Sequence, residues 1–66
     1  MKIYHVIRNK GDVFVSIMFN KSDKSYQFVN LTKGHICSCR FKTVEDAIND
    51  MQSKKDSGEI IDFIEI

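Results

Sequence analysis

The chain has 66 residues and a formal net charge of +1; 42% of the residues are hydrophobic, 29% are charged, and none is Pro or Trp. A chain of this length supports one small core, so we expect a single domain over residues 1–66. The balanced composition excludes intrinsic disorder, no apolar run is long enough to span a membrane, and residues 1–8 lack the apolar stretch of a signal peptide.

Four segments before residue 43 are rich in β-branched and aromatic residues and are separated by polar, Gly-containing or Ser-containing turns, a pattern that predicts strands. The predicted strands cover residues 2–8, 13–20, 25–31 and 35–42. The second strand has the clearest pattern, because Val13, Val15, Ile17 and Phe19 alternate with other residues and so share one face.

The apolar spacing then changes from two residues to that of an amphipathic helix. Val44, Ala47, Ile48 and Met51 fall at positions i, i+3, i+4 and i+7, and Thr43 is a suitable N-cap. The pattern therefore predicts a helix over residues 44–56, which Gly58 would end.

Residues 60–66 carry apolar side chains on both faces and predict a fifth strand. The expected fold is α+β, a ββββαβ chain with a mainly antiparallel sheet and the helix on one face. Four meandering strands and a helix that reverses the chain leave the fifth strand antiparallel to the first, so we expect the order 5-1-2-3-4.

The single helix can cover only one face of such a sheet, and the remaining face then has a surplus of apolar residues. Phe14 and Met18 point away from the helix if the odd positions of their strand point toward it. Either the pair Tyr26 and Phe28 or the pair Val29 and Leu31 joins them. We take the following residues as a candidate protein-binding sheet face: Phe14, Met18, Tyr26, Phe28, Ile36, Arg40 and Lys42.

The sequence predicts neither a cofactor nor a metal site. His35, Cys37 and Cys39 have ligand chemistry, but a strand would hold His35 and Cys39 about 13 Å apart, too far for one zinc ion. We expect both cysteines to be reduced, which indicates a cytoplasmic protein. We also expect no enzymatic activity, because no nucleophile, acid–base pair or Gly-rich phosphate loop stands out.

The two parts of the chain carry opposite charge. Residues 1–42 hold eight cationic and two acidic side chains, and residues 43–66 hold two cationic and seven acidic ones. Such a division can orient the chain against a charged partner.

The leading hypothesis is a small protein-binding regulator or inhibitor of the kind that phages and mobile elements encode. One alternative is binding of nucleic acid by the basic, aromatic half, in which Phe14, Tyr26 and Phe28 stack on bases and Lys33, Arg40 and Lys42 contact phosphates. Another is an acidic nucleic-acid mimic that uses Glu45, Asp46 and Asp50 with the last strand. Ile61, Phe63 and Ile64 could also join two copies in a homodimer.

Residues 41–47 resemble the strand-to-helix junction of the small arm-binding modules of tyrosine integrases and of AP2-type DNA-binding domains, and they are also similar to the junction in HicB-type antitoxins. The resemblance to the integrase modules would imply DNA contact by the sheet. Residues 26–30 contain no Arg or Lys where those modules read DNA, so the resemblance assigns no role to any residue of this chain.

Overall fold

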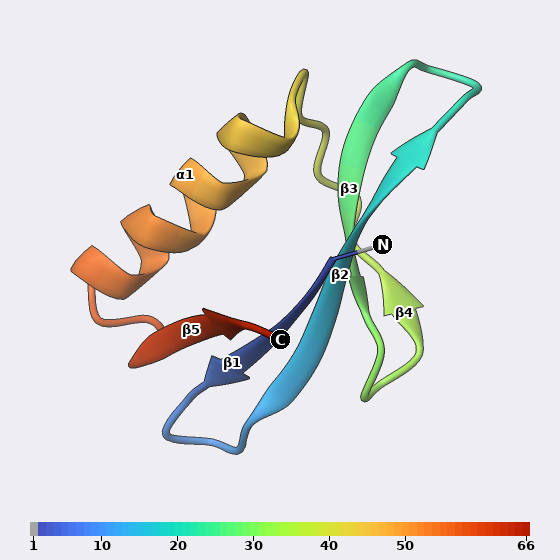
Figure 1. Cartoon of the computed structure of the whole chain (residues 1–66). Coiled ribbons are helices and arrows are strands. Elements are labelled where there is room, and N and C mark those ends of the chain that lie inside the picture. The colour runs from blue at the N-terminus through green and yellow to red at the C-terminus, as the bar shows by residue number, and fades with distance from the viewer. Residues whose placement is uncertain (1) are drawn as a thin grey trace.

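A computed structural model of the chain describes residues 2–66 as one five-stranded antiparallel sheet with one helix on one of its faces (Figure 1). The elements, in chain order, are β1 (Ile3–Ile7), β2 (Val13–Asn20), β3 (Ser25–Asn30), β4 (His35–Ile36), α1 (Val44–Asp56) and β5 (Asp62–Glu65). The strand order is β4-β3-β2-β1-β5, which confirms the expected α+β fold and the position of the last strand beside the first.

The helix begins and ends where the sequence predicts. The Thr43 hydroxyl accepts a hydrogen bond of 3.0 Å from the backbone N–H of Asp46, and Gly58 adopts a φ of 83° just after the last turn. The predicted stripe points at the sheet, with Ala47 and Met51 buried.

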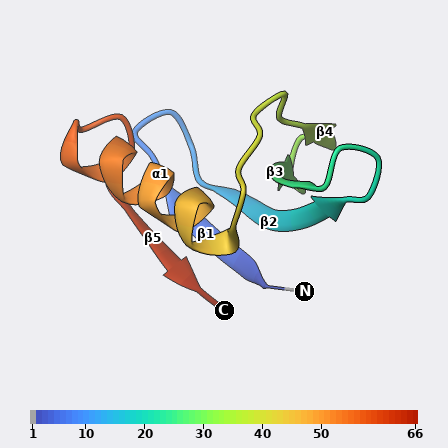
Figure 2. The same cartoon turned by 90° about the horizontal axis from the view of Figure 1, so that it is seen from above.

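The core lies between α1 and the helix-facing side of the sheet. Figure 2 shows the helix from above, lying across β1. The core is formed by Tyr4, Val6, Val13, Phe28, Ala47, Met51 and Ile60. The strand register explains this set, because Val6 pairs with Val13 and Ile17 pairs with Phe28, so these side chains share one face. Phe28 therefore belongs to the core, and Val29 and Leu31 are the pair that points away from the helix.

The predicted fourth strand is wrong in its extent, because β4 contains only His35 and Ile36. Cys37 donates its N–H to the carbonyl of Phe28, and the next contact with β3 is the isolated bridge between Phe41 and Tyr26. Gln27 alone therefore faces residues 38–40, which form a bulge in which regular pairing is lost. The predicted fifth strand is also shorter, since regular pairing begins only at Asp62.

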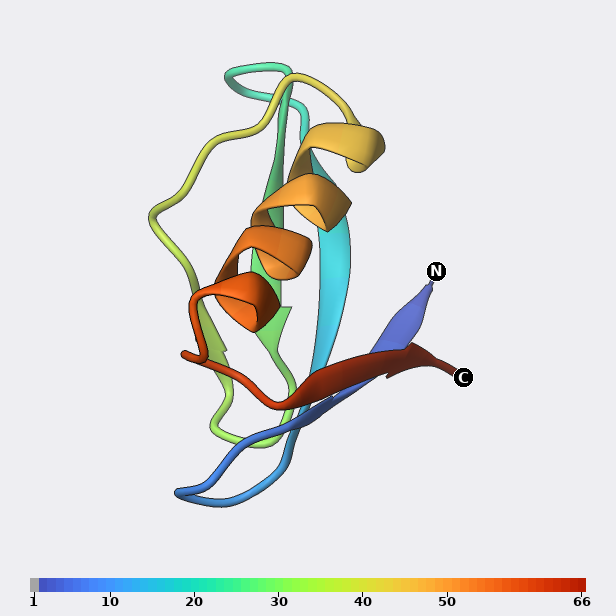
Figure 3. The same cartoon turned by 90° about the vertical axis from the view of Figure 1, so that its left-hand side faces the viewer.

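The helix covers only part of its side of the sheet, and the opposite face carries no helix (Figure 3). The strands twist strongly, so that β1 and β5 cross under one end of α1 while β2 and β3 run along it. No helix within residues 2–66 has both the length and the apolar character that crossing a membrane requires.

Candidate protein-binding face

The sheet face opposite α1 carries no helix within residues 2–66, and it combines apolar side chains with the buried polar residues Ser16, Ser25 and Gln27. We call it the open face; its apolar members are Ile3, Ile7, Phe14, Met18, Val29, Leu31, Ile36 and Ile64. Exposed fractions are 42% for Phe14, 44% for Leu31, 57% for Ile36 and 48% for Ile64. These four large side chains come from β2, β4, β5 and the turn after β3, so the fold gathers them from distant parts of the sequence.

The centre of the open face is nearly without charge. The titratable groups that the register places on this face are His5 on β1 and, at the edge of the sheet, Asp62 on β5. The His5 ring stacks on Phe14 with centroids 5.0 Å apart, and its Nε2 lies 3.0 Å from Oδ2 of Asp12. Oδ1 of Asp62 lies 3.1 Å from Nζ of Lys55. Each of the two groups thus has a partner of its own, and the surface between them offers dispersion contacts rather than charge.

The seven residues predicted for this face divide between different places. Phe14, Met18 and Ile36 lie on the open face, as expected. Tyr26 and Phe28 lie on the helix side of the sheet: Phe28 is buried, and Tyr26 packs against Phe19 with ring centroids 5.1 Å apart. Their placement on the outward face is therefore corrected, and the cause is a strand whose two faces are both apolar.

The two basic members of the predicted set lie at the bulge and after it. Arg40 donates from Nε to Asp23 and from one terminal nitrogen to the carbonyls of Ser38 and Cys39, each at 3.0 Å. This guanidinium fixes the bulge. Lys42 is exposed in the bend before α1.

The same hydrogen bonds change the pKa of the Asp23 carboxylate. A hydrogen bond from the Ser25 side chain, followed by the one from Arg40, holds the pKa of Asp23 below its usual value. The ion pair of Asp23 with Arg40 therefore persists to a lower pH than that of an ordinary aspartate would.

The aromatic residues proposed for stacking nucleic-acid bases do not share a face. Phe14 lies on the open face, whereas Tyr26 and Phe28 lie on the other side of the sheet. Lys33 is exposed in the turn before β4. The structure thus gathers no platform from the three aromatic residues that the nucleic-acid hypothesis requires.

The acidic candidates lie on α1, where Glu45 and Asp46 are exposed in the first turn. Asp50 is half-buried, and its Oδ2 lies 3.1 Å from Nζ of Lys54. Two of the three carboxylates remain free of ion pairs within residues 2–66. They also favour the helix dipole, which alone accounts for their position.

The residues of the candidate dimer strand differ in their surroundings. Phe63 turns toward the core and packs edge-on against Tyr4, with ring centroids 6.3 Å apart. Ile64 is on the open face, and Ile61 is 53% exposed just before β5. β5 pairs with β1 along one edge, and its other edge faces no strand of residues 2–66.

His35, Cys37 and Cys39 do not form a metal site in the part of the chain that the structure describes, where no three His, Cys, Asp or Glu side chains gather. Both cysteines are free, and the backbone N–H of Cys39 donates to Sγ of Cys37 at 3.2 Å. Burial, followed by the hydrogen bond with Cys37, raises the pKa of the Cys39 thiol. A raised thiol pKa favours the protonated, unreactive form.

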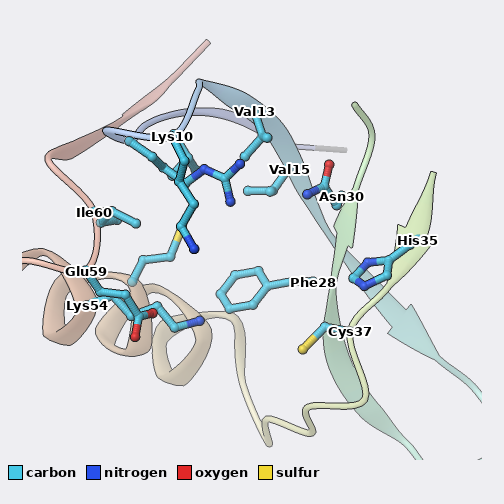
Figure 4. A pocket seen from close by; sticks show the side chains of 13 residues that line it. Lys10, Val13, Val15, Phe28, Asn30, His35, Cys37, Lys54, Glu59 and Ile60 are labelled. Atoms are coloured by element: carbon cyan, nitrogen blue, oxygen red, sulfur yellow. The ribbon is translucent and has the colours of Figure 1, made fainter. Parts of the chain in front are cut away.

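A pocket of about 340 Å³ on the helix side of the sheet is the feature that the sequence does not predict (Figure 4). It opens between the end of α1, the β1–β2 turn and the start of β4. Its lining residues are spread along the sequence from Val6 to Ile60, so no local motif could have indicated it.

No protein-family model, curated protein or solved structure matches this chain.

Proposed function

We propose that this chain acts by binding another protein through its open face. The observation that carries the proposal is the exposure of Phe14, Leu31, Ile36 and Ile64, each more than 40% accessible, on one side of a small sheet. Apolar side chains gathered in this way on a small domain are typical of contact surfaces. Burying them against a partner gains about 25 cal/mol for each Å² of apolar surface removed from water.

The chemistry of the open face favours a protein partner over a nucleic acid. His5 and Asp62 already have partners in Asp12 and Lys55, so the centre of the face offers little to a phosphate backbone. We infer that the partner is a protein whose contact region is apolar and uncharged at its centre. The charged side chains lie around it, where they set orientation and association rate more than affinity.

We propose further that the chain is not an enzyme and that it acts on that partner as a regulator or an inhibitor. We place this activity in the cytoplasm, since the free cysteines Cys37 and Cys39 suit a reducing compartment.

Two phenylalanines of β2 provide a matched test. Phe14 and Phe19 are 42% and 46% exposed, each packs against one aromatic neighbour, and they lie on opposite faces of the sheet. Phe14→Gln removes an anchor of the open face, and Phe19→Gln removes a similar area from the other side. The tagged native chain and each tagged variant are first used to capture partners from nuclease-treated extract. The captured protein is then purified, and its affinity for each of the three chains is measured at 0.1 M and 0.5 M NaCl.

We expect Phe14→Gln to weaken the complex at least about tenfold, as loss of an interface anchor does, and Phe19→Gln to leave it unchanged. Affinity should change little with salt. Equal binding by the two variants would overturn the proposal, as would a complex that nuclease removes. A concentration-dependent dimer that Phe14→Gln dissociates in sedimentation would overturn it as well, by assigning the open face to a second copy of this chain.

A further inference from the structure

The pocket on the helix side exists because α1 is too narrow to cover the whole of its sheet face. It lies beside the last turns of α1, over the ends of β1 and β3 and the beginning of β2, away from the open face. Its volume of about 340 Å³ falls in the range of small-molecule sites.

The floor of the pocket is rigid and apolar. Val6, Val13, Phe28, Met51 and Ile60 contribute to it, and all five belong to the buried core with exposed fractions between 3% and 8%. Because these side chains are held by packing on their other sides, the floor is preformed. The Phe28 ring lies among the lining residues (Figure 4) and contributes an aromatic surface beneath Nζ of Lys54.

The rim of the pocket is cationic. Arg8, Lys10 and Lys54 line it against one carboxylate, that of Glu59. Figure 4 shows the Lys10 side chain extending from the β1–β2 turn into the pocket. Lys10 has no ion pair within residues 2–66, so its charge is available to a ligand.

Two of these cations are oriented by the protein. Nε of Arg8 donates to the carbonyl of Gly11 at 2.8 Å, which leaves the terminal N–H groups of the guanidinium for another acceptor. Nζ of Lys54 lies 5.5 Å from the centroid of the Phe28 ring and is also paired with Asp50. The rim thus carries excess positive charge beside an apolar, aromatic floor.

We propose that this pocket binds a small organic anion with a planar apolar body, of the aromatic carboxylate class. The apolar floor would remove the ring of such a ligand from water. The carboxylate would accept hydrogen bonds from the Arg8 fork and from Lys10, which are charge-assisted and therefore strong. An inorganic anion would leave the floor unused, and a neutral aromatic compound would leave the cations unused.

The experiment is an NMR titration of the ¹⁵N-labelled full chain with 2-naphthoate and, as its neutral match, 2-naphthamide. The expected result is saturable shifts of the amides of Val6, Val13 and Phe28, with 2-naphthoate binding at least about tenfold more tightly than the amide. Raising NaCl from 20 to 200 mM should weaken the binding of 2-naphthoate and leave the binding of 2-naphthamide unchanged.

The variant Arg8→Gln/Lys10→Gln should bring the affinity for 2-naphthoate down to that for 2-naphthamide. The matched control is Lys21→Gln/Lys24→Gln, which removes two exposed positive charges from the β2–β3 turn; it should bind as the native chain does. The ¹⁵N spectrum of each variant reports whether the fold is kept, and single Arg8→Gln and Lys10→Gln variants replace the double one if it is not.

Equal affinity of the native chain for 2-naphthoate and 2-naphthamide would overturn the proposal. So would an equal loss of affinity for 2-naphthoate in the two double variants. Shifts confined to Phe14, Val29 and Ile36 would overturn it too, by placing the compound on the open face. The result is separable from the protein-binding proposal, because Phe14→Gln leaves every residue of the pocket in place.

Discussion

The side-chain amide of Gln27 donates a hydrogen bond of 2.8 Å to the backbone carbonyl of Cys37. Gln27 is 5% exposed, and its carbonyl oxygen accepts from the Asn20 amide at 3.0 Å. This one side chain therefore pairs the Cys37 carbonyl, which the bulge at residues 38–40 would otherwise leave without a partner, and also accepts from the end of β2.

We predict that Gln27→Leu lowers the free energy of unfolding by about 1–3 kcal/mol, because an apolar side chain of similar size leaves the Cys37 carbonyl and the Asn20 amide unpaired. Gln52→Leu is the matched control, since the Gln52 amide also donates to an oxygen, that of Asp56, but on the exposed side of α1. That change should stay within about 0.5 kcal/mol. Urea titration followed by circular dichroism measures the free energy of unfolding of both variants. Equal losses of stability in Gln27→Leu and Gln52→Leu would contradict the role given to Gln27.

The bulge at residues 38–40 could not be predicted from the sequence. Residues 35–42 alternate in polarity like a strand, and nothing local to them reveals that Gln27 replaces regular pairing. The helix and β2 were predictable because each repeats a single period that agrees with its capping or turn residues. The orientation of β3 was not, since Tyr26, Phe28, Val29 and Leu31 place apolar groups on both faces, and only the register with β2 decides between them.

Of the candidate site, the sequence could predict that an apolar sheet face would be left over, because one helix covers one face. It could not predict which residues from β4 and β5 would complete that face. The pocket could not be predicted from the sequence for a related reason, because its cations and its apolar floor come together only once the strands have paired.

The ion pair of Lys55 with Asp62 leads to a prediction about acid pH. The hydrogen bond from Lys55, followed by that from the backbone N–H of Phe63, holds the pKa of Asp62 below its usual value of 3.8. We expect ¹³C carboxyl shifts to show Asp62 titrating below that value in the native chain. In Lys55→Gln the pKa should move back up, and in the control Lys33→Gln it should not move.

The same shift has a defined effect on stability. Because the folded pKa is depressed, the contribution of Asp62 is present above the unfolded pKa, about 4, and is lost as the pH falls through the folded value. The difference in stability between the native chain and Lys55→Gln should therefore shrink below about pH 4. A difference that grows in acid would contradict the assignment.

The cysteines carry a prediction about reactivity. Burial and the contact with Cys37 raise the pKa of Cys39, so little thiolate should form there at pH 8. Burial is the larger cause and remains when Cys37 is replaced, so we expect iodoacetamide to alkylate Cys39 more slowly in the folded Cys37→Ser variant than in the same variant unfolded in urea. The native chain should show two free thiols without reductant and no bound zinc by metal analysis; fewer thiols or one zinc ion per chain would contradict this.

Two isoleucines allow the stability contribution of the core to be compared with that of the open face. Ile60 is 7% exposed in the core, and Ile36 is 57% exposed on the open face. We predict that Ile60→Val costs about 0.5–1.5 kcal/mol of unfolding free energy, whereas Ile36→Val costs close to nothing. Thermal and urea denaturation of the two variants, identical in chemical change, give the comparison directly. If Ile36→Val is as costly as Ile60→Val, the open face is part of the folded core, and its apolar side chains need no partner to explain them. If it is not, folding does not account for Ile36, and the result is in line with the proposal that the open face contacts another protein.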